Sequence, residues 1–523
     1  MTTTNPNSLY NVIKTAVVDG KLPRDFSLPK HGDQELPFAD GAMDGIFMFH
    51  MEHTPMNEDD RAQMVKAVDC MNRADYKASD EELKKLGSMA SAIATPDEFQ
   101  DYIYSHAVNP NDPIDPANPD EVRLTLKNIC DTARWLIAES ENVESVKFGL
   151  IVCEIFKSHP EDIKDVIRTL GLSDEFTIFS VWNLRNWPDG NDEIFDLIQK
   201  VRGWGRVHAL NYLEPRTPEI RHWILMNGTD NDVMPAYTSI TAWGKAGVNY
   251  FLEGDLTPEE FTAVSFILDA LLDEGPADGI SLIADQERFL NLYLDQAEKQ
   301  PLNIIDYDAI LALINWASED DENMPSIYKR CEKILNSDAC EAAAREAIKQ
   351  GDGFTLAEAL NIDYNETLLD LLQKNFETYH GQCWRLMKHE EYVDRVIEIF
   401  EENLPLELMK DEPSMRSGLG PEFNEYSKLL FVLQELDKYP GRGEKILITG
   451  LNSPVINNRY MALRALKTWT KITGKSIKQI SPKIHDALYK LPSKEPDPKL
   501  KADILDLLRG KIYTATDLIP NAN

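Results

Sequence analysis

Apolar residues recur at helical spacing along most of the chain, and the clearest example lies between Gly203 and Gly247. Two helical stretches in this segment are separated by short turns that contain proline and glycine. The apolar positions are Val207, Leu210 and Leu213 in the first stretch, and Ile220, Trp223 and Ile224 in the second. Such faces stay exposed unless neighbouring helix pairs stack on them. The pattern therefore predicts an α-solenoid rather than an α/β enzyme with a central pocket.

The same pattern continues from Glu121 to Leu508 and contains almost no convincing strand. Three helical segments repeat a theme in which a small residue, Gly149, Ala209 or Ala462, precedes a leucine. A small residue at this position permits close approach of a neighbouring helix. The spacing of the three segments is irregular. We therefore predict an all-α fold, an irregular HEAT-like α-solenoid with a less regular N-terminal region.

Three regions are predicted from breaks in this pattern. Residues 1–107 form an N-terminal region of mixed, mainly helical structure, residues 121–440 form the HEAT-like array, and residues 441–523 form a basic C-terminal helical cap. The first break is Val108–Asp120, which contains four prolines and no apolar period and is typical of a linker. Further breaks are predicted at Asp411–Pro421 and Tyr439–Gly443.

The N-terminal region has the least regular pattern. Leu9–Asp19 and Asp59–Asn72 have helical periods. Between them, Leu22–Gly45 is rich in proline, aspartate and glycine. The sequence FADGAMDGIFMFHMEH, residues 38–53, favours a loop followed by a short strand or a buried turn.

Composition and charge restrict the classes of function. The apolar fraction of 43% is typical of a globular chain, and no run of residues is long and apolar enough to span a membrane. The first residues lack the basic start and apolar core of a signal peptide, so we expect a cytoplasmic protein. A net charge of −34 repels nucleic acid and anionic lipid. Six scattered cysteines, without metal-ligand spacing, predict reduced and mostly buried thiols.

The charge is unevenly distributed along the chain. Residues 441–523 contain 15 Lys and Arg against 7 Asp and Glu, a net charge of +8 that leaves −42 for residues 1–440. A basic end of this kind is suited to docking on an acidic surface, in the same molecule or in a second copy. We therefore regard self-association through the C-terminal region as a hypothesis.

Candidate chemistry is sparse. His50 and His53 flank Glu52, but this spacing is not HExxH and a metal would need a third ligand from elsewhere, so we favour a structural turn and predict no metal. Gly203-Trp204-Gly205 resembles the start of a dinucleotide fingerprint but lacks its third glycine and a preceding strand. Asp40–Gly45 lacks the residues of a phosphate loop. We assign no catalytic or cofactor-binding residue from these patterns.

Arginines and tryptophans give two further alternatives. Arg206 and Arg221, with His208 and His222 beside them, either point into a groove and bind carboxylates or form an arginine ladder that joins neighbouring repeats through Asp and Glu. We favour the ladder. The clustered tryptophans are predicted to be mainly core, with a few lining an apolar cavity; they are Trp182, Trp187, Trp204, Trp223 and Trp243.

Four segments resemble a bacterial family of about this length that commonly carries the name limonene hydroxylase. They are ADGAMDGI (39–46), GLSDEFTIFSVW (171–182), GWGRVHALNYLEP (203–215) and LLDEGPADGIS (271–281). The resemblance implies an oxidoreductase that hydroxylates limonene at allylic positions and oxidises the resulting carveol or perillyl alcohol, with NAD and FAD as cofactors. It supplies no catalytic residue. The alternative is a non-catalytic α-solenoid scaffold that binds a protein or peptide partner, so both functions remain open.

Overall fold

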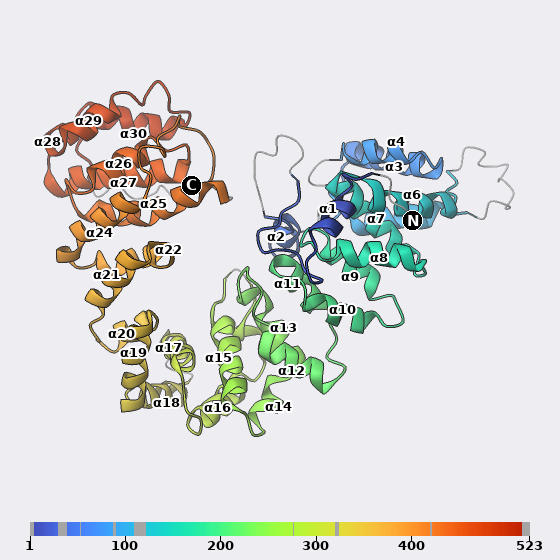
Figure 1. The fold of residues 1–523 in the computed structure, drawn as a ribbon, viewed down its shortest axis with the longest axis horizontal. Helices are drawn as coiled ribbons and strands as arrows, with labels where there is room; N and C mark the ends of the chain where they lie inside the picture. Colours follow the sequence, from blue (N-terminus) through green and yellow to red (C-terminus); the bar gives the residue numbers. More distant parts are fainter. Residues whose placement is uncertain are drawn as a thin grey trace. The chain divides into compact units, whose positions relative to one another are not determined.

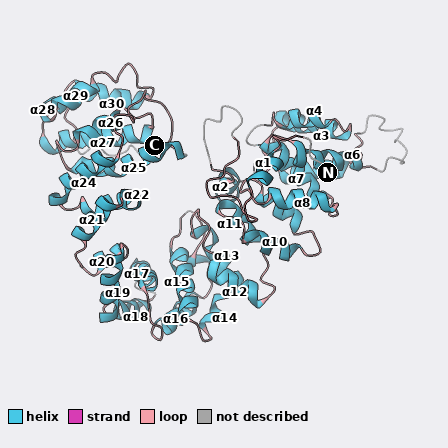
Figure 2. Cartoon of the chain, in the orientation of Figure 1, coloured by secondary structure: helices cyan, strands magenta, loops and turns pink. Residues whose placement is uncertain are grey.

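The structure is a computed structural model that describes residues 5–29, 39–52, 54–86, 90–108, 122–275, 277–319, 324–418 and 421–514 (Figure 1). Within these ranges the regular elements are helices joined by turns and loops, with three isolated β-bridges (Figure 2). The predicted all-α class is confirmed. No helix in the described ranges has both the length and the apolarity needed to cross a lipid bilayer.

The described chain divides into two compact units, with the boundary between Cys340 and Glu341. The region boundaries predicted from the sequence lie elsewhere, after residue 107 and before residue 441. The boundary has no sequence signal because it falls inside a helix, Asp338–Gln350, whose composition does not change there. Of the predicted linker, only Val108 is described, and its N–H donates to the carbonyl oxygen of Leu124.

The first unit contains the helices that surround the candidate site. Their bounds are α1 Leu9–Ala16, α2 Ala42–His50, α3 Glu58–Asn72, α4 Tyr76–Leu83, α5 Pro96–His106, α6 Leu126–Glu139, α7 Val143–Ile155, α8 Glu161–Leu170, α9 Thr177–Leu184, α10 Gly190–Ile198, α11 Gly203–Tyr212, α12 Pro218–Asn227, α13 Ala236–Ala246, α14 Val248–Leu252, α15 Pro258–Leu272, η2 Ile280–Leu282, α16 Gln286–Ala297, α17 Ile304–Glu319 and α18 Pro325–Leu335. Helix α19, Asp338–Gln350, crosses the boundary.

Alternate helices of the first unit pack on one another in chain order. Helix α7 packs on α9, α9 on α11, α11 on α13, α13 on α15 and α15 on α17. The intervening α8, α10 and α12 each pack on the next helix of this row. At Gly149 of α7, one of the three small residues that the sequence singled out, close approach depends on the missing side chain: a Cβ there would lie 2.8 Å from Ile137 Cγ2 on α6. This order of packing is compatible with the predicted solenoid.

The N-terminal helices share the core of the first unit. Helices α3, α4 and α5 pack on α6 or α7, so the region before residue 107 is continuous with the helical row. The two helices predicted here are confirmed as α1 and α3. The short strand or buried turn expected within residues 38–53 is wrong, because the segment forms helix α2 after Gly41, which adopts φ +75°. Only Asp44 and Gly45 of α2 are buried, and its apolar side chains are half-buried or exposed, so a run of consecutive apolar residues did not distinguish this short helix from a strand.

The second unit contains the remaining helices. Their bounds are α20 Phe354–Ala359, α21 Asn365–Lys374, α22 Phe376–Tyr379, η3 His380–Gln382, α23 Cys383–Leu386, α24 Glu390–Asn403, η4 Pro421–Phe423, α25 Asn424–Glu435, η5 Leu436–Lys438, α26 Glu444–Leu451, α27 Ile456–Thr473, α28 Ile477–Ile480, α29 Pro482–Leu488 and α30 Pro498–Leu508. Helix α27 is central and packs on α25, α26 and α30. All six cysteines of the chain are buried and free, as predicted.

Candidate functional site

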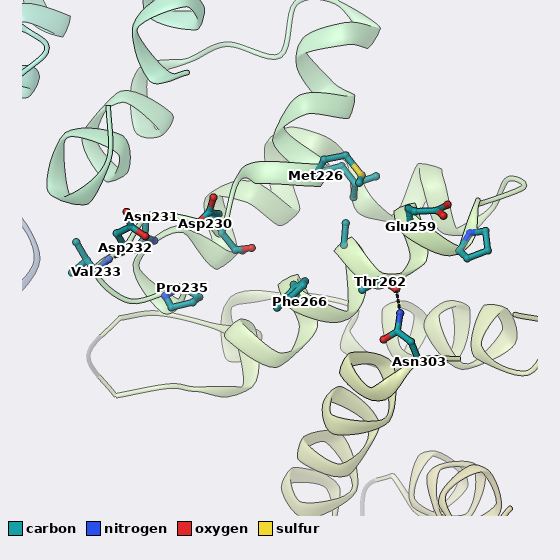
Figure 3. Close-up of a pocket in the computed structure, with 14 residues that line it drawn as sticks. Met226, Asp230, Asn231, Asp232, Val233, Pro235, Glu259, Thr262, Phe266 and Asn303 are labelled. Atoms are coloured by element: carbon teal, nitrogen blue, oxygen red, sulfur yellow. Dashed lines mark hydrogen bonds between the residues drawn. The ribbon is translucent and has the colours of Figure 1, made fainter. Parts of the chain in front are cut away.

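A pocket of about 680 Å³ in the first unit is lined by the end of α12, the loop between α12 and α13, α15 and Asn303 (Figure 3). This volume is within the range of small-molecule and side-chain binding pockets. The lining residues are Leu225, Met226, Thr229, Asp230, Asn231, Asp232, Val233, Pro235, Pro258, Glu259, Thr262, Ala263, Phe266 and Asn303. The pocket therefore combines an apolar interior with several carboxylates.

The apolar part of the pocket is accessible to solvent. Phe266 is 49% exposed, Met226 37% and Val233 36%, although large apolar side chains are usually buried. In the view of Figure 3, Phe266 lies between the loop around Asp232 and the polar side chains of α15 and Asn303. Several exposed apolar side chains around one pocket are typical of a binding surface.

Carboxylates surround the apolar part. Asp230 and Asp232 follow α12, and their oxygens lie 3.6 Å and 3.3 Å from nitrogens of Arg206 and Arg202, respectively. Glu259 lies in the exposed first turn of α15, and the described residues give it no ion-pair partner. The rim is therefore only partly neutralised and favours a ligand with positive charge.

Buried Asn231 determines the shape of the loop between α12 and α13. Its side-chain oxygen accepts hydrogen bonds from the N–H groups of Val233 and Met234, both at 2.9 Å. Its amide nitrogen donates to Thr238 Oγ1 at 2.9 Å. Local bonds of this kind are characteristic of asparagine in turns. They hold Val233 and Asp232 at the pocket before any ligand binds.

The far end of the pocket is polar. Asn303 Nδ2 donates to Thr262 Oγ1 at 2.7 Å, as the dashed line in Figure 3 shows. Behind this pair, Ser265 Oγ donates to Asp306 Oδ1 at 2.8 Å and lies 3.0 Å from the hydroxyl of buried Tyr293. These groups satisfy one another, so they position Thr262 and Asn303 at the pocket wall.

A second feature, the Lys147 hub, lies beneath α2 and is built from Lys147, Asp44, Glu175 and Asp174. Lys147 Nζ on α7 is 3.0 Å from Asp44 Oδ2 on α2 and 2.5 Å from Glu175 Oε1 before α9. Gly41 N–H, which precedes α2, donates to Glu175 Oε2 at 2.6 Å. One buried ammonium and two carboxylates thus attach α2 to the helical row.

Burial and neighbouring charges shift the pKa values in the hub. Burial disfavours the Lys147 ammonium, but the carboxylates around it raise its pKa well above the ordinary value. Burial also opposes the charge of Glu175, yet Lys147 and the Gly41 N–H lower its pKa. The described residues place no such cation beside Asp174, so burial raises its pKa to about 8, against hydrogen bonds from the N–H groups of Gly205 and Trp204. Burial raises the pKa of Asp44 as well.

Glycines permit the close packing of the hub. A Cβ on Gly203, which adopts φ +51°, would lie 1.9 Å from Asp174 Oδ2, and one on Gly45 would lie 2.3 Å from the indole of Trp204. A Cβ on Gly205 would lie 2.5 Å from Thr177 Oγ1. Three of the four segments that carry the family resemblance therefore meet in space at this hub.

The hub is connected to the pocket through Tyr237, in the first turn of α13. Phe49 of α2 and Trp204 of α11 both pack on the Tyr237 ring, with centroid distances of 4.9 Å and 4.8 Å. Tyr237 follows Pro235, which lines the pocket, after one residue. The hub therefore supports the side of the pocket that the loop forms.

No protein-family model, curated protein or solved structure matches the chain.

The residues selected from the sequence lie mostly outside the pocket. His50 Nε2 is 2.8 Å from the Tyr237 hydroxyl, and His53 is outside the described residues. No cluster of three potential histidine, cysteine, aspartate or glutamate metal ligands occurs in the described ranges. His208 is buried, which lowers its pKa to about 4, so it is neutral at physiological pH. His222 pairs with Glu260 at 3.2 Å.

Only part of the predicted arginine ladder forms. Arg206 packs over the ring of Trp223 at 5.2 Å and bonds the carbonyl oxygen of Asn227, which joins α11 to the end of α12. Burial lowers the pKa of Arg206, although Asp230 opposes that shift. Arg221, in contrast, donates to the carbonyl oxygen of Pro215 within its own turn.

The predicted core tryptophans are confirmed for Trp182, Trp187 and Trp204, which are buried, whereas Trp223 and Trp243 are half-buried. None of the five lines the pocket described above.

The turn at Gly203–Gly205 does not fit a dinucleotide phosphate. In a dinucleotide fold, the N–H groups at the start of a helix bind the pyrophosphate. Here the N–H groups of Trp204 and Gly205 bond the Asp174 carboxylate, and Asp174 also fills the space beside Gly203. An internal carboxylate therefore takes the position that the phosphate would need.

Proposed function

We propose that the protein is a helical-repeat binding scaffold whose first unit binds a basic segment of a protein partner in the pocket lined by α12, the loop that follows it and α15. A single observation supports this function: exposed Phe266, Met226 and Val233, here called the apolar floor, line the same pocket as the carboxylates of Asp230, Asp232 and Glu259. An apolar side chain next to lysine or arginine complements both parts. The floor removes the apolar group from water, and the rim attracts the cation.

Peptide selection tests this proposal and does not require that the partner be identified. Phage-displayed random peptides are selected on the wild-type protein and counter-selected on Phe266→Arg, which places a cation in the pocket. We expect enriched peptides with an aromatic or large aliphatic residue next to Lys or Arg. Their synthetic forms should lose about tenfold or more in affinity for Phe266→Arg.

A matched control is Leu282→Arg, which introduces the same charge at an exposed apolar position of η2. This variant should bind the selected peptides as the wild type does, and binding should weaken as salt increases. Peptides without net positive charge, or peptides that bind Phe266→Arg equally well, would refute the proposal.

The second candidate function is the oxidation of limonene, which the family resemblance implies. The pocket supports it because the apolar floor suits a monoterpene and the Thr262 hydroxyl and Asn303 lie at its polar end. The turn at Gly203–Gly205 does not fit a dinucleotide, so we derive no step that involves NAD or FAD.

An activity assay distinguishes the two functions. Purified protein is examined for the visible absorbance of flavin and is then incubated with limonene or carveol and NADH or NAD. NAD-dependent turnover that Phe266→Arg abolishes and Leu282→Arg preserves would favour the oxidoreductase. A colourless protein without turnover that binds basic peptides would favour the scaffold.

A further inference from the structure

The second unit contains a basic C-terminal segment, residues 441–523, whose charge is complementary to that of the pocket region. Residues 441–523 contain 15 Lys and Arg against 7 Asp and Glu, whereas residues 214–274, which supply most of the pocket, contain 3 against 11. Their net charges are thus +8 and −8. Although the whole chain has a net charge of −34, residues 441–523 are positively charged and are therefore electrostatically complementary to the acidic pocket region.

Much of this positive charge is not neutralised locally. Several lysines at the end of α27 and on α28 to α30 are exposed, and the described residues provide no carboxylate within ion-pair distance of them. They are Lys471, Lys475, Lys478, Lys490, Lys499 and Lys501. Such lysines act at a distance on an acidic partner, and salt screens their effect.

One strongly exposed aromatic residue, Tyr489, lies within this basic segment. Tyr489 follows the last residue of α29, its side chain is 76% exposed, and the exposed Lys490 comes next. Tyr489 and Lys490 thus supply an apolar side chain next to a cation, which is the combination that the pocket is proposed to bind. The ring suits the floor at Phe266, and the ammonium suits the carboxylate of Glu259 at the rim, for which the described residues supply no ion-pair partner.

We propose that the pocket of one copy binds the Tyr489–Lys490 end of α29 in a second copy of the chain, an inference that rests on the function proposed above. The two surfaces differ, so the interface is head-to-tail and leaves one free pocket and one free α29 end in each pair. Copies therefore add in rows or close into a ring. Assembly should strengthen with protein concentration and weaken with salt.

A complementation experiment tests this geometry by sedimentation velocity at low ionic strength. Phe266→Arg disables the pocket, and the double variant Tyr489→Ala, Lys490→Glu disables the α29 end. We expect each variant alone to lose about tenfold or more in self-association. An equimolar mixture should form dimers and nothing larger, because each pair retains one functional pocket and one functional end. Circular dichroism establishes that both variants fold.

Two controls match the variants. Tyr250→Ala removes a tyrosine that is 75% exposed in the first unit, and Leu282→Arg adds a charge away from the pocket. Both should assemble as the wild type does. Assembly of the disabled variants alone, or a mixture that stays monomeric, would overturn the proposal.

Peptide binding separates this inference from the function on which it rests. Binding of selected basic peptides by a wild-type protein that stays monomeric overturns the second-copy interface and leaves the scaffold function standing. If Tyr489→Ala then increases peptide affinity, the α29 end occupies the pocket of its own chain instead. If the protein neither binds peptides nor assembles, both proposals are overturned.

Discussion

Replacement of Lys147 by methionine tests whether the Lys147 hub stabilises the first unit. Methionine keeps the length and apolar stem of lysine and removes only the ammonium. That ammonium lies 3.0 Å from Asp44 Oδ2, 2.5 Å from Glu175 Oε1 and 3.5 Å from Glu144 Oε1. After the substitution, the carboxylates of Asp44 and Glu175 stay buried without a cation.

The expected loss follows from this geometry. Removal of one partner from a buried ion pair costs about 3–5 kcal/mol, because the remaining charge is left without compensation. Asp44 can take up a proton, which limits its own contribution. Glu175 retains the Gly41 N–H as a hydrogen-bond donor. We therefore expect the free energy of unfolding of the first unit to fall by about 3 kcal/mol at pH 7.

Urea unfolding followed by tryptophan fluorescence measures this change, because seven of the nine tryptophans precede residue 341. Lys200→Met is a matched control: Lys200 pairs with Asp196 on α10 at 2.5 Å, and both side chains are accessible to solvent. Exposed pairs contribute about 0–1 kcal/mol, so the control should change stability little.

The pH dependence of the Lys147→Met effect gives an independent check. Without the ammonium, the pKa of Asp44 rises further and the pKa of Glu175 rises from its lowered value, and protonation relieves the buried charge. The deficit relative to the wild type should therefore be smaller at pH 5 than at pH 8. A shift equal to that of Lys200→Met, or a deficit that does not depend on pH, would refute the assigned role of the hub.

Three further predictions concern other buried contacts. Burial raises the pKa of Asp174 from 3.8 to about 8, so the native state holds a proton that the unfolded state releases. The free energy of unfolding therefore falls by up to about 1.4 kcal/mol per pH unit as the pH rises between these values. In Asp174→Asn, the urea midpoint should depend less on pH across this range. Gly45→Ala should lower the thermal midpoint through a loss of about 1–3 kcal/mol because its Cβ meets an indole, whereas Gly244→Ala, with no atom within 4 Å of its Cβ, should not. Arg459→Met should destabilise the second unit by about 3–5 kcal/mol, measured by hydrogen exchange of residues 341–514, because it leaves buried Glu495 without its partner at 2.9 Å; unchanged exchange would contradict this.

The fold class was predictable because helical burial leaves a periodic pattern in the sequence. Val207, Leu210 and Leu213 were placed on one face from their spacing, and all three are buried in the structure. The same reasoning failed for α2. Its sequence, AMDGIFMFH, has no single apolar face, and a periodic argument cannot distinguish such a short helix from a strand.

The pocket was not predicted because its components are distant in sequence and individually ordinary. Asp232 and Val233 belong to a turn, Phe266 looks like one of several apolar residues of α15, and Asn303 precedes α17. The exposure of Phe266 depends on how α12 and α15 pack, which periodicity does not determine. The only available signal was Asn231, whose position before a proline-containing turn is typical of a structural asparagine.

The hub also explains why short segments of this chain are distinctive in composition without containing a catalytic motif. Asp174 lies close enough to Gly41, Gly203 and Gly205 that a Cβ at any of these positions would lie within 3 Å of one of its atoms. Lys147 pairs with carboxylates from two other segments. Replacement of one of the glycines leaves a clash, and replacement of a charged residue leaves an unpaired charge. Because the same contacts hold Tyr237 beneath the pocket loop, stable folding of these segments and binding at the pocket depend on one set of residues, and substitutions in the hub should weaken peptide binding in proportion to their effect on α2.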